Sequence, residues 1–192
     1  MKSVVFLLDV SGSMEHKKAT VVNVANETLT RLYIECSGDD IYVKIYTFNE
    51  VMRVLYEGPL HVDTQVTLEQ LITEGNTALY DALGTLLQEI TEGTTLVIAT
   101  DGEDNKSDKY DIHDICDMIA DAKRNKQLKI NYLCEGKEAF ECGTQIGLTQ
   151  GDGVHSMRVE RFDSGVPIDE FAASCVESVK SQQSNKRNKT QN

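Results

Sequence analysis

The most constraining feature of this chain is a short apolar run that ends in an acidic residue and two serines. Residues 4–8 are all apolar and include two valines, which predicts a strand buried on both faces of a parallel sheet. The sequence Asp9-Val10-Ser11-Gly12-Ser13 follows at once. Oxygen ligands at this spacing suit a hard cation such as Mg²⁺ or Mn²⁺ better than they suit zinc. The alternative is a helix N-cap, because Ser and Asp often precede a helix.

Apolar periodicity divides the rest of the chain into alternating strands and helices. It predicts strands at 3–9, 41–48, 51–56, 95–100, 130–134 and 154–160, long helices at 17–36, 78–90, 112–125 and 168–179, and short helices at 66–72 and 138–148. The link at 49–50 is so short that the strands on either side of it must pair antiparallel. The expected fold is therefore α/β: a doubly wound, mostly parallel sheet of about six strands with one antiparallel edge strand and helices on both faces.

The length and the composition of the chain predict one domain followed by a short tail. The 192 residues fit a single domain, which we expect to span residues 1–181. Residues 182–192 consist mainly of Gln, Ser, Asn and basic residues, with nothing to bury, and predict a disordered polar and basic tail.

The charge of the chain limits its partners. The formal net charge is −12, and the last twelve residues contain three basic residues and no acidic one, so the body is more acidic still. Such a body would be repelled by phosphate backbones, which argues against nucleic acid as a main partner. No apolar run is long enough to span a membrane, and the N-terminus does not resemble a signal peptide. The sequence therefore predicts a cytoplasmic protein.

The cysteines argue against a zinc site or a disulfide framework. There are five of them, and no two form a CxxC pair. Structural zinc sites need closely spaced pairs, and disulfide frameworks usually have an even number of cysteines. We expect free and mostly buried thiols.

Two later segments supply further oxygen ligands. In doubly wound folds, ligands bind outside the carboxyl ends of the strands, where the strand order reverses. Asp9 and Asp101 each lie at the carboxyl end of a predicted buried strand, so both carboxylates face one cleft if those strands are neighbours. Thr77 lies in the loop before the helix that leads into the second of these strands, and its hydroxyl can approach the same cleft.

With these residues in place, the chain resembles the von Willebrand factor A domain family over roughly residues 1–181. That family has a metal-ion-dependent adhesion site with the pattern DxSxS, then a threonine, then an aspartate after the fourth strand. The resemblance implies that hydroxyls and carboxylates surround a cation, directly or through water; the residues are Asp9, Ser11, Ser13, Thr77 and Asp101. Asn76 is a departure, because a second glycine is frequent there. The segments 77–83 and 100–105 are similar to those of stand-alone bacterial and phage members.

The resemblance implies a metal-dependent protein-binding module and not an enzyme. The expected cation is Mg²⁺, with Mn²⁺ or Ca²⁺ as alternatives. Two carboxylates and neutral hydroxyls leave a divalent cation incompletely neutralised, with positions still filled by water. Such a cation reverses the local sign of the charge, so an acidic domain can bind a carboxylate of a protein partner.

Two other functions stay open from the residues. A Mg²⁺-dependent phosphotransferase or phosphatase of the haloacid dehalogenase type also has an aspartate after its first strand. That chemistry needs a second acid two residues later, where this chain has Ser11. The other possibility is a structural protein in which the metal only stabilises the fold.

Three further acidic residues lie near the expected site. Glu103 and Asp104 could add hydrogen bonds around the ligands or belong to a solvated acidic loop. Asp81, in the first turn of its helix, interacts favourably with the helix dipole.

Overall fold

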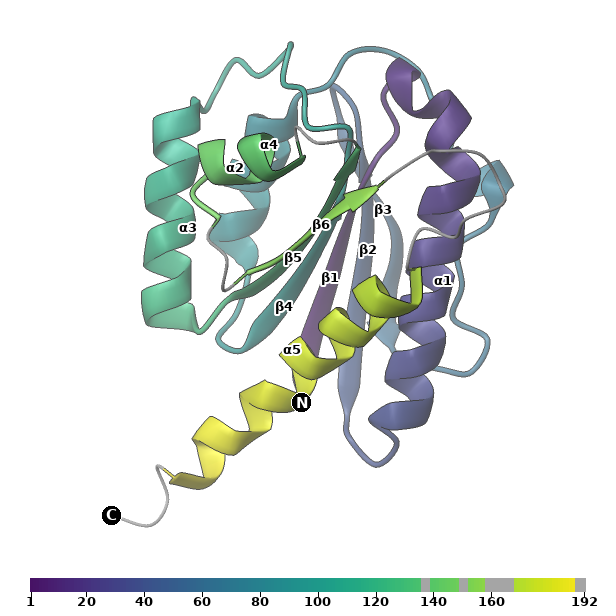
Figure 1. Cartoon of the computed structure of the whole chain (residues 1–192), viewed down its shortest axis with the longest axis vertical. Helices are drawn as coiled ribbons and strands as arrows, with labels where there is room; N and C mark the ends of the chain where they lie inside the picture. Colours follow the sequence, from purple (N-terminus) through teal and green to yellow (C-terminus); the bar gives the residue numbers. More distant parts are fainter. Residues whose placement is uncertain (136–138, 149–151, 158–167, 189–192) are drawn as a thin grey trace.

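A computed structural model of the chain describes residues 1–135, 139–148, 152–157 and 168–188 (Figure 1). Strands and helices alternate along it, with two short 3₁₀ segments, η1 and η2. The elements are β1 (Lys2–Asp9), η1 (Gly12–Lys17), α1 (Lys18–Glu35), β2 (Ile41–Phe48), β3 (Met52–Pro59), η2 (Leu68–Gln70), α2 (Leu79–Glu89), β4 (Thr94–Ala99), α3 (Ile112–Lys126), β5 (Lys129–Glu135), α4 (Ala139–Gln145), β6 (Gly153–Met157) and α5 (Ile168–Asn188).

The strands form one six-stranded sheet in the order β3-β2-β1-β4-β5-β6. Only β3 is antiparallel to its neighbour, and it lies at the edge, as the short link after β2 requires. The predicted fold class is therefore confirmed. The strand order reverses at β1, which lies between β2 and β4, so the ends of β1 and β4 meet at the edge where doubly wound folds bind ligands.

The apolar run in β1 is buried on both sides because its residues alternate between two cores. Val4, Phe6 and Leu8 pack with residues of α1 and α5, whereas Val5 and Leu7 pack with residues of α2 and α3. Figure 1 shows these helices on opposite faces of the sheet. A strand that is covered on both faces has no polar side, which explains the continuous apolar run in the sequence.

The last helix, α5, extends beyond the end of the predicted domain. Its buried residues include Phe171, Cys175 and Val179, and Gln182 is only 9% exposed. The helix continues to Asn188, although the sequence predicts a disordered tail from residue 182. Packed turns remove the cost of nucleating a helix, so further residues can be added to it without burying apolar surface. Residues 189–192 of the predicted tail, and residues 158–160 of the predicted last strand, lie outside the described residues.

The segment 66–72, predicted as a short helix, contains only the single 3₁₀ turn η2. The Asn26 side chain explains why the segment does not begin as a helix. Its amide nitrogen donates to the Val66 carbonyl at 2.9 Å, and its oxygen accepts from the Val66 N–H at 2.8 Å. Helix α1 therefore binds the backbone of this segment as a neighbouring strand would.

Two other expectations concern membranes and cysteines. Within the described segments, no helix combines the length and the apolar character needed to cross a bilayer. Among the described residues, Cys36, Cys116 and Cys175 are free thiols.

Candidate metal centre

Asp9 ends strand β1 with its carboxylate buried and hydrogen-bonded. One oxygen, Oδ1, accepts from the Ser11 N–H at 2.8 Å, and Oδ2 accepts from the Thr100 hydroxyl at 2.7 Å. Burial raises the pKa of Asp9 above its ordinary value, and the nearby Asp101 carboxylate raises it further, although the hydrogen bonds act in the opposite direction. A cation bound near Asp9 would favour the charged form of this carboxylate.

The two serines of the DxSxS pattern point toward each other. Their Oγ atoms are 3.2 Å apart, with Ser11 buried and Ser13 exposed. Ser11 stands immediately before η1, but its side chain makes no capping hydrogen bond. The hydroxyl is therefore not used as a helix N-cap, which was the alternative interpretation of this serine.

Asp101 follows β4, and one of its carboxylate oxygens is buried without a hydrogen-bond partner among the described residues. Its Oδ2 lies 3.4 Å from the ammonium of Lys17, and these side chains are only 8% and 4% exposed. Its Oδ1 is buried and has no hydrogen-bond partner in the described part of the chain. A buried carboxylate oxygen without a partner is costly, so this atom is a candidate metal ligand. Lys17 was not predicted, because its contact with Asp101 joins segments that are 84 residues apart in the sequence.

Thr77 is fixed between the loops that follow β1 and β4, and it is only 2% exposed. Its N–H donates to the Asn105 side chain at 2.9 Å, and its carbonyl accepts from the Asn105 N–H at 3.0 Å. On the other side, Gly12 N–H donates to the Gly75 carbonyl at 3.0 Å. These bonds attach the Thr77 loop to both ligand loops. Asn105 was missed because one sequence does not show which distant backbone a loop amide will bind.

Asn76, the departure from the family pattern, has a definite contact. Its backbone N–H and side-chain amide both donate to Glu50 Oε1, at 3.1 and 2.8 Å. The preceding Gly75 has φ +72°, a left-handed conformation that glycine adopts without strain. The loop therefore needs one glycine, and the asparagine adds a contact to the loop after β2.

The two acidic residues after Asp101 differ in their environment. Asp104 Oδ1 accepts from the Tyr80 N–H at 3.1 Å and from the Ser107 hydroxyl at 2.6 Å, which fixes the loop after β4 to the start of α2. Glu103 is exposed and forms no hydrogen bond or ion pair within the described residues.

Asp81 fixes a later part of the same loop. Its carboxylate accepts from the N–H groups of Asp108, Lys109 and Tyr110 at 2.9–3.0 Å. Partial burial raises the pKa of Asp81, but these backbone donors together lower it below its ordinary value. Asp81 thus orders the loop in addition to lying at the start of α2.

The Tyr110 ring lies against Gly84 on the same face of α2, and its hydroxyl accepts from Gln88 at 2.9 Å. A Cβ atom at residue 84 would lie 2.6 Å from ring atoms Cγ and Cε2. We expect Gly84→Ala to lower the free energy of unfolding by about 1–3 kcal/mol, whereas Gly→Ala inside an unobstructed helix usually stabilises it. Urea denaturation followed by circular dichroism measures the change.

A double-mutant cycle tests this cause. The loss caused by Gly84→Ala should become smaller in a Tyr110→Ser background, where the ring is absent. An equal loss in both backgrounds would contradict the steric explanation.

The geometry fits a divalent cation bound mainly by oxygen. Two carboxylates and two hydroxyls are gathered at the carboxyl ends of β1 and β4, and one buried carboxylate oxygen lacks a partner. No group of three or more His, Cys, Asp and Glu side chains placed for a metal occurs in the part of the chain that the structure describes. A cation here would therefore depend on neutral hydroxyl ligands as well as carboxylates, as a hard ion allows.

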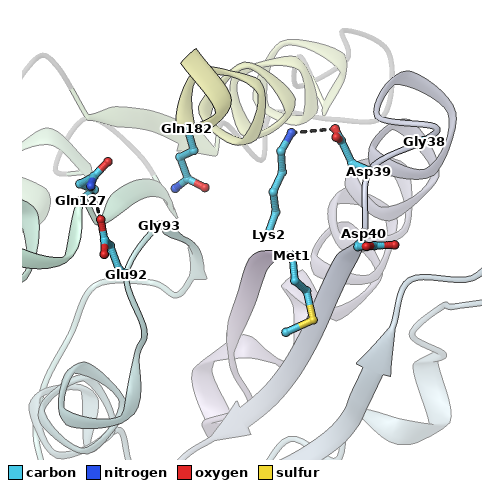
Figure 2. A pocket seen from close by; sticks show the side chains of 9 residues that line it. All are labelled: Met1, Lys2, Gly38, Asp39, Asp40, Glu92, Gly93, Gln127 and Gln182. Atoms are coloured by element: carbon cyan, nitrogen blue, oxygen red, sulfur yellow. Dashed lines mark hydrogen bonds and ion pairs between the residues drawn. The ribbon is translucent and has the colours of Figure 1, made fainter. Parts of the chain in front are cut away.

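A pocket of about 280 Å³ lies at the opposite edge of the sheet, among the amino ends of the strands (Figure 2). Lys2 pairs with Asp39 at 2.7 Å on one side of it, and Gln127 donates to Glu92 on the other. Gln182 of α5 lies between them. The eight-residue strand β1 separates this pocket from Asp9, a distance of about 25 Å, so the pocket is separate from the candidate metal centre.

Comparison with known structures identifies the same fold in several proteins. A von Willebrand factor type A protein from Catenulispora acidiphila matches with a TM-score of 0.59 and 17% identity over 93% of this chain and 42% of that one. BatB from Bacteroides thetaiotaomicron matches with a TM-score of 0.56 and 16% identity over 94% of this chain and 100% of that one. Proximal thread matrix protein 1 from the mussel byssus, with a zinc-occupied MIDAS motif, has a TM-score of 0.59 and 11% identity over 95% of this chain and 48% of that one.

These structural matches support the fold, whereas the family assignment rests on a match of the sequence. The chain spans less than half of the Catenulispora and mussel proteins. No curated protein matches it. The sequence model of the von Willebrand factor type A domain matches residues 3–165. Because this match covers every strand of the sheet and most of the helices, the chain belongs to the von Willebrand factor type A domain family.

Proposed function

We propose that this chain is a metal-dependent protein-binding module. A divalent cation would be held by Asp9, Ser11, Ser13, Thr77 and Asp101, with Asp104 and Asn105 ordering the loops around these ligands. The observation that carries the proposal is the buried Asp101 Oδ1, which lacks a hydrogen-bond partner in the described residues beside the Asp9 carboxylate and the serine pair. Domains of this family are generally interaction modules and not enzymes.

The charge of the ligands explains how a partner would be recognised. When bound, the cation supplies a positive centre with coordination positions still open to an oxygen from outside. Ser11, Ser13 and Thr77 contribute no charge, so the neutralisation depends on the two carboxylates alone. A carboxylate on a partner protein is the complementary ligand, and it would not be attracted to a chain of net charge −12 without the metal.

We propose Mg²⁺ as the cation, with Mn²⁺ or Ca²⁺ as alternatives, because the ligands are oxygens. The mussel protein of the same fold has a zinc-occupied MIDAS motif, which supports a metal at this position of the fold. The segments 77–83 and 100–105 are similar to those of stand-alone bacterial and phage domains, so we propose a cytoplasmic protein of that type.

Thr77→Val tests the metal centre because it removes a hydroxyl and keeps the shape of the buried side chain. We expect the affinity for Mn²⁺ to fall by roughly 10- to 100-fold, and partner capture with Mg²⁺ to fall with it. Titration calorimetry measures the metal, and a pull-down from the source cell's lysate, with Mg²⁺ and again with EDTA, measures the capture.

Two further variants serve as controls. Thr77→Ser keeps the hydroxyl and should bind Mn²⁺ nearly as well as wild type, and Thr30→Val makes the same change at an exposed position of α1. Partner capture that EDTA and Thr77→Val leave unchanged would place the binding surface elsewhere and leave the metal a structural role.

A further inference from the structure

We propose that Lys17 is an internal counter-cation of the metal centre. Its ammonium stabilises the metal-free site and lowers the affinity of that site for a divalent cation. It also makes the metal-loaded site more positive toward a partner. This inference rests on the proposed function and adds to it a residue outside the DxSxS, threonine and aspartate pattern.

Lys17 is buried beside the carboxylate of Asp101. Lys17 ends η1, the segment that begins one residue after Ser11, and its side chain reaches the loop after β4. Its ammonium lies 3.4 Å from Asp101 Oδ2, with 4% of the side chain exposed. Lysine is rarely buried to this extent unless it is paired, and a charge pair away from water interacts far more strongly than one at the surface.

The two carboxylate oxygens of Asp101 have different environments. Oδ2 faces the lysine, whereas Oδ1 is buried and has no hydrogen-bond partner in the described residues. One carboxylate can therefore face an ammonium with one oxygen and a metal with the other. Lysine and metal then interact with the same negative charge, and each weakens the attraction of the other.

Lys17 also changes the formal charge of the centre. Asp9 and Asp101 carry two negative charges, and Lys17 offsets one of them. A divalent cation therefore meets a less negative site than the two carboxylates alone would provide, and the loaded centre is more positive by the charge of the lysine. The fixed positive charge of the lysine repels the metal ion and attracts an incoming carboxylate. It therefore weakens metal binding and strengthens the binding of the carboxylate.

Mn²⁺ binding distinguishes this role from a purely structural ion pair. Removing a structural lysine would loosen the ligand loops and weaken metal binding, whereas removing a counter-cation strengthens it. We expect Lys17→Gln and Lys17→Met to raise the Mn²⁺ affinity by about tenfold or more, and Lys17→Arg to stay near wild type. Lys18→Gln is the matched control, because it removes the same charge one residue later at a half-exposed position. The signal of free Mn²⁺ in electron paramagnetic resonance measures each affinity.

Stability without metal gives a second measurement. In EDTA, the urea midpoint of Lys17→Gln should fall below that of Lys18→Gln, since two buried carboxylates lose their cation. Saturating Mn²⁺ should remove that difference, and a Lys17→Gln protein that folds only with Mn²⁺ would also support the proposal.

The outcomes separate this inference from the proposed function. Suppose that wild type binds Mn²⁺ and that Lys17→Gln and Lys17→Met both bind it no more tightly than wild type. That result would overturn the counter-cation role and leave the proposed function intact. Binding by these variants but not by wild type would support the counter-cation role and overturn the metal dependence of the native protein. Binding by none of the proteins would overturn both.

Discussion

Asp9→Asn should lower the affinity for Mg²⁺ or Mn²⁺ by roughly a thousandfold, because a charge about 4 Å from a cation contributes about 4 kcal/mol at an effective dielectric constant of about 20. The metal-free protein should nevertheless be at least as stable as wild type at pH 7. The asparagine oxygen can still accept from Ser11 N–H, and its amide can donate to the Thr100 hydroxyl. Calorimetric titration measures the affinity, and urea denaturation in EDTA measures the stability.

The exposed Asp63→Asn is the control, because it removes the same charge outside the site and should change neither quantity. Metal binding retained by Asp9→Asn would contradict the assigned ligand set. A large loss of stability in EDTA would mean that the Asp9 charge is needed for folding itself.

The pH dependence of stability follows from the same carboxylate. Burial raises the pKa of Asp9 in the metal-free fold above its ordinary value of 3.8. The native state therefore binds more protons than the unfolded state between the two pKa values, so stability falls as the pH rises through that window. Above this pH window, Asp9 is ionised in both states, and its destabilising contribution no longer changes with pH. In EDTA, Asp9→Asn should lose this contribution to the pH dependence, while Asp63→Asn should keep it.

Phe171→Ala should lower the free energy of unfolding by about 3–5 kcal/mol, as other buried phenylalanines do when truncated. Phe171 is 1% exposed and belongs to the core that α5 shares with α1 and β1. Such a loss is a large fraction of the about 5–15 kcal/mol that stabilises a typical domain. Urea unfolding followed by circular dichroism measures it, because the chain has no tryptophan.

Glu170→Ala, at the exposed neighbouring position, is the control and should change stability by less than about 0.5 kcal/mol. If Phe171→Ala were as mild as this control, α5 would not be an integral part of the domain core.

The fold was predictable because its strands are buried on both faces. Residues 4–8 and 96–99 are continuous apolar runs, and α/β sheets are the usual setting of such runs when helices alternate with them. The short link at 49–50 fixed the antiparallel edge for a steric reason. Each of these signals depends on residues that are close in the sequence.

The placement of Asp9 and Asp101 at the carboxyl ends of buried strands was also predictable, whereas only the structure shows that these two strands are neighbours. The conformation of the segment 66–72 was not predictable, since the Asn26 side chain binds the Val66 backbone from a distant helix. The C-terminal end of α5 was not predictable either, because the helix continues past its last apolar residue.

The sequence by itself determined the order of the strands and helices, the buried faces and the oxygen-rich ends of β1 and β4, since local patterns encode burial and strand ends. Only the tertiary structure decided what surrounds those ends. It brought Lys17 to Asp101, Asn105 to Thr77, and Asp81 to the loop at 108–110. Charge pairs and side-chain hydrogen bonds between distant segments depend on which loops meet in space, and the spacing of residues along one chain does not record that.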